Sequence, residues 1–191
     1  MHYLADVLEA HLAPRTRPGI VISDERGVLL ETGGGVMKAW PQLSAGPFLI
    51  HNSDSVWIEG SSDSSRQSAP NLDRLCEGFD ASRMDSLMLL APAANSLGYD
   101  GDGDFDMDGE GRLIRRGDKR NVPYVFAGVS IAHPRLFDGA SPGRFSLNRV
   151  WDRAIARGRL YGLVLDGIWM HVGTPEAVID AERLMTREEA R

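Results

Sequence analysis

The spacing of apolar residues predicts helices at several places along the chain. Apolar side chains recur at helical spacing from Leu4 to Leu12, and Pro14 follows the last of them. Ser146 and Thr174 precede two further amphipathic stretches and suit the N-cap position. Helices are therefore expected over residues 2–12, 36–43, 71–79, 146–157 and 174–185.

Short apolar runs between these stretches predict β-strands. Asp108–Gly111 lies between two such runs and predicts a hairpin turn. The expected strands cover residues 20–23, 28–30, 48–51, 86–91, 105–107, 112–115, 124–133 and 160–165. Because strands and helices alternate and hairpins gather in the second half, we expect one α/β domain over residues 1–191. Its central sheet should be mixed, with helices on its faces.

The composition argues against several classes of function. The chain has 191 residues, a formal net charge of −6 and 25% charged residues. An acidic balance argues against a general nucleic-acid surface and against a polybasic membrane patch. Cys76 is the single cysteine, so neither a disulfide framework nor a cysteine zinc cluster is expected. The sequence shows no long apolar run typical of a signal peptide or a transmembrane helix, and we expect a cytoplasmic protein.

Aspartates at alternating positions from Asp100 to Asp108 invite a calcium-binding interpretation. Starting at Asp104, the sequence DFDMDG matches the first half of an EF-hand loop. The twelfth position of that loop is Arg115, however, where a bidentate glutamate is required. A solvated hairpin is therefore the preferred interpretation. A calcium-binding module stays as an alternative that calcium-dependent melting would support.

Three other motifs hold residues that suit phosphate or metal chemistry. Thr32–Gly35 places three glycines before a predicted helix, whose free N–H groups and Lys38 suit an anion. Asp54 ends the sequence Asn-Ser-Asp after a predicted strand, where a carboxylate can hold a metal ion bridged to phosphates. His171 alternates along a strand before a helix start. Each motif alone is explained as well by an ordinary turn or a packed side chain.

Taken together and in order, the motifs resemble those of the sugar-1-phosphate nucleotidyltransferases. The matching sequences are TGGGVMKA, NSD, GDFDMDGEGRL, YVFAGVSIAHP and GIWMHVGTPE. The likeness covers almost the whole chain and is strongest to the small bacterial branch that includes N-acetylmuramate-1-phosphate uridylyltransferase and mannose-1-phosphate guanylyltransferase. It implies a Rossmann-like nucleotidyltransferase fold and a role in cell-envelope sugar metabolism. In the implied reaction, a sugar-1-phosphate oxygen attacks the α-phosphorus of a nucleoside triphosphate and pyrophosphate leaves.

The resemblance also assigns roles to single residues. Nucleotide binding falls to Thr32, Gly33, Gly34, Gly35 and Lys38, and the sugar pocket to Gly103, Asp104 and Gly128. Asp54 and His171 are the expected catalytic and metal-binding residues, with Mg²⁺ as the ion and Mn²⁺ as the alternative. His171 stands where many relatives have an aspartate, and imidazole suits manganese or zinc better than magnesium. The implied substrates are UTP or GTP and a sugar-1-phosphate.

One motif of that family does not occur in this chain. Relatives begin with a strand and a loop of the type LAAGxGxRMxP, which clamps the triphosphate, and the sequence holds no counterpart. We expect such an N-terminally truncated fold to expose apolar sheet edges, which favours a homodimer. Three interpretations follow: an active enzyme with a segment before Met1, a protein that binds nucleotide or sugar without turnover, and the calcium-binding module.

Overall fold

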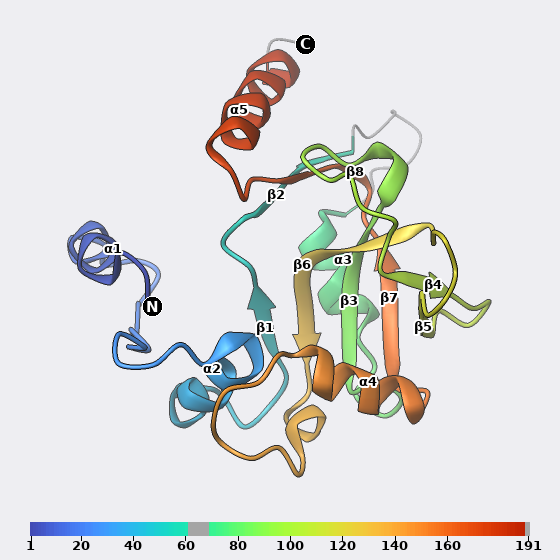
Figure 1. Ribbon diagram of the computed structural model, residues 1–191, viewed down its shortest axis with the longest axis horizontal. Coiled ribbons are helices and arrows are strands. Elements are labelled where there is room, and N and C mark those ends of the chain that lie inside the picture. The colour runs from blue at the N-terminus through green and yellow to red at the C-terminus, as the bar shows by residue number, and fades with distance from the viewer. Residues whose placement is uncertain (61–68, 190–191) are drawn as a thin grey trace.

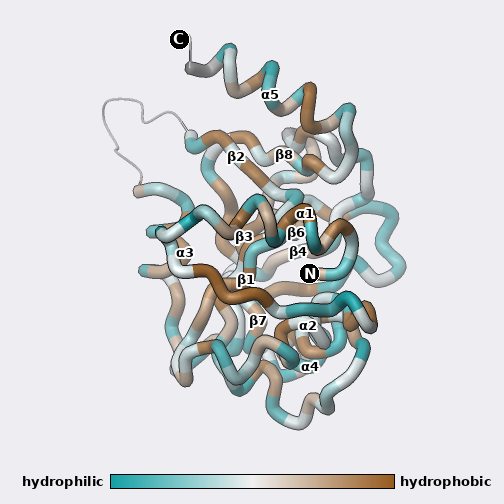
Figure 2. The backbone as a smooth tube through the Cα atoms, turned by 90° about the vertical axis from the view of Figure 1, so that its left-hand side faces the viewer, coloured by the Kyte–Doolittle hydropathy of each residue, from teal (hydrophilic) through white to brown (hydrophobic). Residues whose placement is uncertain are grey.

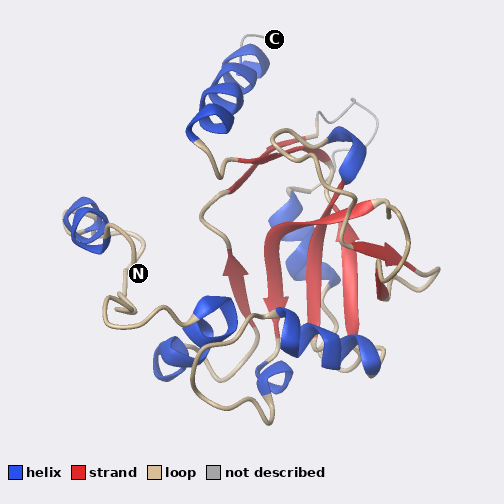
Figure 3. Cartoon of the chain, viewed as in Figure 1, coloured by secondary structure: helices blue, strands red, loops and turns tan. Residues whose placement is uncertain are grey.

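Six strands form the main sheet of the computed structural model, which describes residues 1–60 and 69–189 (Figures 1 and 3). They are β1 Phe48–His51, β3 Ser86–Pro92, β4 Phe105–Met107, β5 Leu113–Arg115, β6 Tyr124–Ala132 and β7 Leu160–Val164. The order is β5-β4-β6-β3-β7, and β1 pairs with β6. Because β3 runs antiparallel to β6 and parallel to β7, the prediction of a mixed sheet is confirmed.

Helices cover both faces of this sheet. The helices of the structure are α1 Ala5–Leu12, α2 Glu31–Ala39, α3 Asn71–Gly78, α4 Asn148–Ala156 and α5 Pro175–Glu189, with short 3₁₀ helices η1 Trp40–Gln42, η2 Ala93–Asn95 and η3 Pro134–Phe137. Of these, α4 and α3 pack on opposite faces of the main sheet, whereas α1 and α5 lie away from it (Figure 1). Met88 and Leu90 of β3 pack with Val150 of α4, whereas Leu89 packs with Leu75 of α3. Burial on both faces explains the continuous apolar run of β3. None of the helices among the described residues is long and apolar enough to cross a membrane.

A second, two-stranded sheet lies beyond one end of the main sheet (Figure 1). It pairs β2 (Ser55–Glu59) antiparallel with β8 (Gly167–His171), so that Ser55 stands opposite His171. The apolar pattern does not predict β2, because its only ladder partner in the described chain is distant in sequence. Ser55 and Trp169, for example, are 114 positions apart. This small sheet brings the segment after β1 to the segment after β7.

The N-terminal segment departs from the prediction. Residues 20–23 and 28–30 form no strand, because they have no ladder partner among the described residues. Instead Arg26 bridges this segment to α1 through Glu9 and Asp6. Several apolar side chains stay open to solvent there, including Val21, which is 69% exposed. Figure 2 views the molecule from the side on which α1 and β1 lie and shows hydrophobic stretches along it.

The glycine motif also departs from the predicted turn. Thr32–Gly35 lies inside α2, which begins at Glu31 and not at residue 36. The N–H groups of Gly33 and Gly34 both donate to the carbonyl oxygen of Phe145, at 2.9 and 3.0 Å. A Cβ atom on Gly33 would lie 2.9 Å from that oxygen, so the glycines let α2 pack directly on the backbone before α4.

The acidic stretch forms the predicted hairpin of β4 and β5. Basic side chains pair with its aspartates: Asp102 with Arg116, Asp106 with Lys119 and Asp108 with Arg112. The hydrogen bond from Lys119 is the largest cause that lowers the pKa of Asp106 below its ordinary value. Carboxylates that already have cationic partners are poor calcium ligands, so the structure supports the solvated hairpin over the calcium-binding module.

Candidate active site

Asp54 and His171 lie side by side at the end of the small sheet. The backbone N–H of Val172 donates to the carbonyl oxygen of Asp54 at 2.8 Å and extends the ladder by one bond. Oδ2 of Asp54 and Nδ1 of His171 are 4.0 Å apart, and the two side chains are 46% and 40% exposed. The structure therefore brings the two predicted catalytic residues into one site that solvent can reach.

A cavity of about 180 Å³ opens beside this pair, and we call it the Asp54 cavity. It is lined by Asn52, Asp54, Ser55, Tyr99, Val125, Phe126, Gly128, Trp169 and His171. These residues come from the end of β1, from β2, β6 and β8, and from the segment after η2. No lysine or arginine is among them. The described cavity therefore offers a carboxylate and an imidazole but no permanent positive charge to a phosphate.

Ser55 fixes the turn that carries Asp54. Its buried hydroxyl donates to the carbonyl oxygen of Ala127 in β6 and accepts a hydrogen bond from Nε1 of Trp169 at 2.8 Å. The Trp169 ring in turn stacks on the imidazole of His171, with centroids 6.0 Å apart and planes 24° apart. Ser55 and Trp169 thus hold both sides of the Asp54–His171 pair through one set of contacts.

Two glycines leave room for this arrangement. Gly128 of β6 has φ +79°, and a Cβ atom there would lie 2.6 Å from Cβ of Ser55. A Cβ atom on Gly173 would lie 2.8 Å from Nε2 of His171. Gly128 lacks both the space and the backbone conformation for a side chain, whereas a side chain at residue 173 would displace the His171 ring from its present place. The predicted sugar-pocket residue Gly128 therefore does line the Asp54 cavity.

The other two predicted sugar residues lie behind the wall of the cavity. The N–H of Gly103 donates to the Tyr99 hydroxyl at 3.0 Å, and Oδ2 of Asp104 accepts from the N–H of Phe126 at 2.9 Å. Burial raises the pKa of Tyr99, and the charge of Asp104 adds to the rise. Gly103 and Asp104 thus position Tyr99 and Phe126, two side chains that face the cavity.

The predicted nucleotide-binding residues stand elsewhere. Thr32 Oγ1 accepts from the N–H of Leu147 at 3.0 Å, and Lys38 Nζ donates to the carbonyl oxygen of Asp24. Neither they nor the three glycines of α2 line the Asp54 cavity. Their role in nucleotide binding stays a prediction.

Ser55, Tyr99 and Trp169 contribute to the site but are not among the residues that the sequence motifs predict. Each looks like an ordinary strand or loop residue in the sequence. The alternation of Trp169 with His171 along β8 was the available signal, because residues two apart on a strand share one face. Ser55 and Tyr99 gain their roles only through distant neighbours.

The donor set at Asp54 and His171 suits one divalent cation. Ligand atoms lie about 2.0–2.2 Å from such an ion, so two of them stand at most about 4.4 Å apart. The 4.0 Å separation is within that limit, and a shift of about 1 Å in these half-exposed side chains would bring the two atoms to the roughly 3.0 Å between neighbouring ligands of an octahedral ion. Among residues 1–60 and 69–189, no group of three or more His, Cys, Asp or Glu is arranged to hold a metal. Most of the coordination would therefore fall to water and phosphate oxygens, as is usual for Mg²⁺.

Comparison with known proteins identifies the family. The chain is 40% identical over 187 residues to N-acetylmuramate alpha-1-phosphate uridylyltransferase of Caulobacter vibrioides, covering 95% of this chain and 74% of that protein. No protein-family model matches the sequence.

Solved structures show the same fold at low sequence identity. HddC from Yersinia pseudotuberculosis, in complex with GMP-PN, superposes with a TM-score of 0.64 at 15% identity, over 95% of this chain and 74% of that one. A putative glucose-1-phosphate thymidylyltransferase from Bacillus anthracis gives a TM-score of 0.66 at 13% identity, over 94% and 71%. The Rossmann-like fold is thereby confirmed. Because it is 40% identical to the curated relative, the chain belongs to the sugar-1-phosphate nucleotidyltransferase family, and the named proteins that it resembles are enzymes.

Proposed function

We propose that this protein transfers a uridylyl group from UTP to N-acetylmuramate α-1-phosphate or a related N-acetylated sugar-1-phosphate, in the sugar metabolism of the cell envelope. The observation that carries the proposal is the 40% identity to a uridylyltransferase over 95% of the chain. That relative also favours UTP over GTP. The Asp54–His171 pair supports the proposal because its carboxylate and imidazole can hold the divalent cation that this reaction uses.

In this proposal Asp54 and His171 hold a divalent cation, Mg²⁺ or Mn²⁺, together with substrate phosphate oxygens. When bound, the ion neutralises charge on the phosphates during transfer. Ser55 and Trp169 keep the carboxylate and the imidazole in place, and Tyr99 and Phe126 shape the wall beside them. The protein thus positions the sugar phosphate oxygen against the α-phosphorus, and no covalent intermediate with the chain is required.

A pyrophosphate-release assay tests the proposal. With UTP, N-acetylmuramate α-1-phosphate and Mg²⁺ or Mn²⁺, the wild-type protein should release pyrophosphate, and GTP should replace UTP poorly. Asp54→Ala removes a ligand and should lower turnover by about 10²-fold or more. Asp118→Ala, at an exposed aspartate outside the cavity, is the matched control. Equal turnover of the Asp54 variant and the wild type would refute the role of Asp54.

A second candidate function is binding of nucleotide or sugar without turnover. One observation favours it: no lysine or arginine lines the Asp54 cavity in the described part of the chain. Phosphoryl transfer depends on cationic stabilisation of the developing charge. Binding of UTP by calorimetry, with no pyrophosphate released from UTP in the presence of any of the sugar-1-phosphates tried, would identify this second function.

A further inference from the structure

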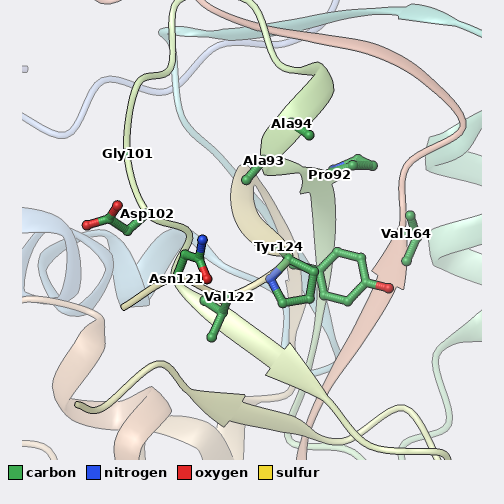
Figure 4. Close-up of a pocket in the computed structure, with 10 residues that line it drawn as sticks. Pro92, Ala93, Ala94, Gly101, Asp102, Asn121, Val122, Tyr124 and Val164 are labelled. Carbon is green, nitrogen blue, oxygen red and sulfur yellow. The ribbon is translucent and has the colours of Figure 1, made fainter. Parts of the chain in front are cut away.

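Basic side chains line neither the Asp54 cavity nor a larger cavity at the carboxyl ends of β3 and β7. Figure 4 shows the larger cavity, whose volume is about 810 Å³. Asp102 is the charged residue of its lining, and Oδ2 of this residue already accepts from Arg116 at 3.0 Å. No lysine or arginine of the described chain lines either cavity. The cations of the described chain therefore lie elsewhere, and several of them follow α4.

Three arginines form a line along α4, and we call them the arginine stripe. Arg149, Arg153 and Arg157 are four positions apart, so each lies about one helical turn, or roughly 6 Å, from the next. Arg149 and Arg157 are exposed, and Arg153 is half-buried. The other side of α4 packs in the core through Val150 and Ala154. The stripe thus follows the outer side of this helix.

No carboxylate of the described chain pairs with the arginine stripe. Asp152, the acidic residue on α4, is already paired with Arg115 at 2.7 Å. Arg149 lies over the Phe145 ring, 5.8 Å from its centroid, and forms no ion pair among the described residues. Like charges four positions apart on a helix repel one another. The stripe therefore destabilises the free protein slightly, and a bound anion would remove that repulsion.

Arg153 also holds two donors that the described chain does not use. Its Nη1 donates to the carbonyl oxygen of Asp138 at 3.0 Å. Its Nε and Nη2 are shut off from solvent and have no hydrogen-bond partner among the described residues. Donors of a cation that lack acceptors are unfavourable. A rotation of the long side chain away from Asp138 would turn these donors outward, where one carboxylate can accept from both.

The surroundings of the arginine stripe narrow the class of anion. The stripe lies near the end of the main sheet that is opposite to the small sheet (Figure 1). None of the exposed large apolar side chains lies between residues 115 and 177, so α4 has none to insert into a membrane. The net charge of −6 repels a long nucleic acid. A short acidic segment of another protein meets neither obstacle.

We propose that the arginine stripe binds an acidic helix of a partner protein. Glutamates or aspartates at every fourth position of such a helix repeat at the same spacing of roughly 6 Å, so three carboxylates can face three guanidinium groups. Arginine suits this contact because its planar fork matches a carboxylate. The inference goes beyond the proposed function and does not depend on it, because the stripe lines neither cavity.

Fluorescence anisotropy with two synthetic peptides tests the proposal. The first is an alanine-rich helical peptide with three glutamates four positions apart, and the second has the same composition with its glutamates adjacent. At about 50 mM salt, where surface charges are only weakly screened, the wild-type protein should bind the first peptide at least about fivefold more tightly than the second. Equal affinity for both peptides, or no binding of the first, overturns the proposal.

Substitution of the exposed arginines locates the binding. Arg149→Gln/Arg157→Gln should weaken binding of the first peptide by about tenfold, roughly threefold for each exposed ion pair lost. The matched control is Arg183→Gln/Arg187→Gln, at two exposed arginines that are also four positions apart, on α5. Because Arg183 is already paired with Asp180 at 3.2 Å, this control should stay within about twofold of wild type. Equal weakening by both double variants overturns the proposal.

A charge exchange keeps the test decisive if a substitution disturbs folding. Arg149→Glu/Arg157→Glu should lose the glutamate peptide and gain a peptide with lysines in place of its glutamates, which a misfolded variant would not do. Vesicles of phosphatidylcholine and phosphatidylglycerol, and polyuridylic acid, are the rival probes. If the wild type binds either rival probe but not the peptide, and Arg149→Gln/Arg157→Gln abolishes that binding, the acidic helix is refuted as the partner.

Discussion

Gly128 shows how one missing side chain shapes the Asp54 cavity. Its φ is positive, and a Cβ atom there would lie 2.6 Å from Cβ of Ser55, so the position has no place for a larger residue. The sequence predicted Asp54, His171 and Gly128 at the site, because short motifs mark them. It could not predict Ser55 or Tyr99, because their partners Ala127 and Gly101 are ordinary backbone contacts that no local pattern encodes.

The substitution Gly128→Ala should destabilise the protein by about 2–4 kcal/mol. The left-handed conformation costs a non-glycine residue about 1–2 kcal/mol, and the clash with Ser55 adds overpacking strain of similar size. Urea unfolding measures the change. Gly109→Ala is the control, because a Cβ atom there meets nothing within 4 Å, and it should stay within about 0.5 kcal/mol of wild type. Equal stability of the two variants would contradict the prediction.

At the scale of elements, the strands of the main sheet were predicted best. The runs at β1, β3, β6 and β7 appear where the apolar pattern indicated, because each is paired within the main sheet. Residues 20–23 show an equally apolar pattern but have no ladder partner in the described chain, and they form no strand. The glycines of α2 were predicted as a turn, since glycine is a poor helix former when tertiary contact is ignored. Contact with Phe145 overrides that preference.

An ion-pair cluster lies where β3 and β7 begin, at the ends of these strands opposite to Pro92 and Val164. Oδ1 of the buried Asp85 accepts from Nε of Arg135 at 2.6 Å and from Nε of Arg159 at 2.7 Å. Burial alone would raise the pKa of Asp85, but the hydrogen bonds and charges of Arg159 and Arg135 together lower it below its ordinary value of 3.8. The cluster connects the starts of β3 and β7 with η3, which follows β6.

Asp85→Asn should therefore destabilise the protein in a pH-dependent way. At pH 7 the expected loss is about 2–4 kcal/mol, below the cost of a fully buried unpaired charge because Arg135 and Arg159 are 32% and 28% exposed. Because the pKa of Asp85 is lower in the folded protein than its ordinary value of 3.8, its ionised carboxylate stabilises the folded state above pH 3.8. That contribution is lost as the pH falls through the lowered pKa.

Unfolding free energies at pH 7 and below pH 4 check the sign. The gap between wild type and Asp85→Asn should shrink in acid. Asp118→Asn, at an exposed aspartate, should show no such gap at either pH. A gap that grows on acidification would contradict the assignment.

For the whole molecule, the outer edge of β1 is the place where we expect two copies to meet. In the described chain β1 pairs only with β6, and Leu49 of β1 is 47% exposed. Unpaired strand edges with apolar side chains promote association between sheets. We expect a concentration-dependent dimer in analytical ultracentrifugation, and Leu49→Lys should shift it to monomer. Val178→Lys, at an exposed apolar residue of α5, is the control. A wild-type protein that sediments as a monomer at all concentrations would reject the prediction.

The ladder between β2 and β8 also has a kinetic consequence. Contacts between residues as distant in sequence as Ser55 and Trp169, 114 positions apart, form slowly because a long loop must close first. The main-sheet hairpins and α4 can form from near neighbours before that closure. During refolding, helical content should therefore recover ahead of the Asp54–His171 pair, which makes ligand binding the last property of the native state to return.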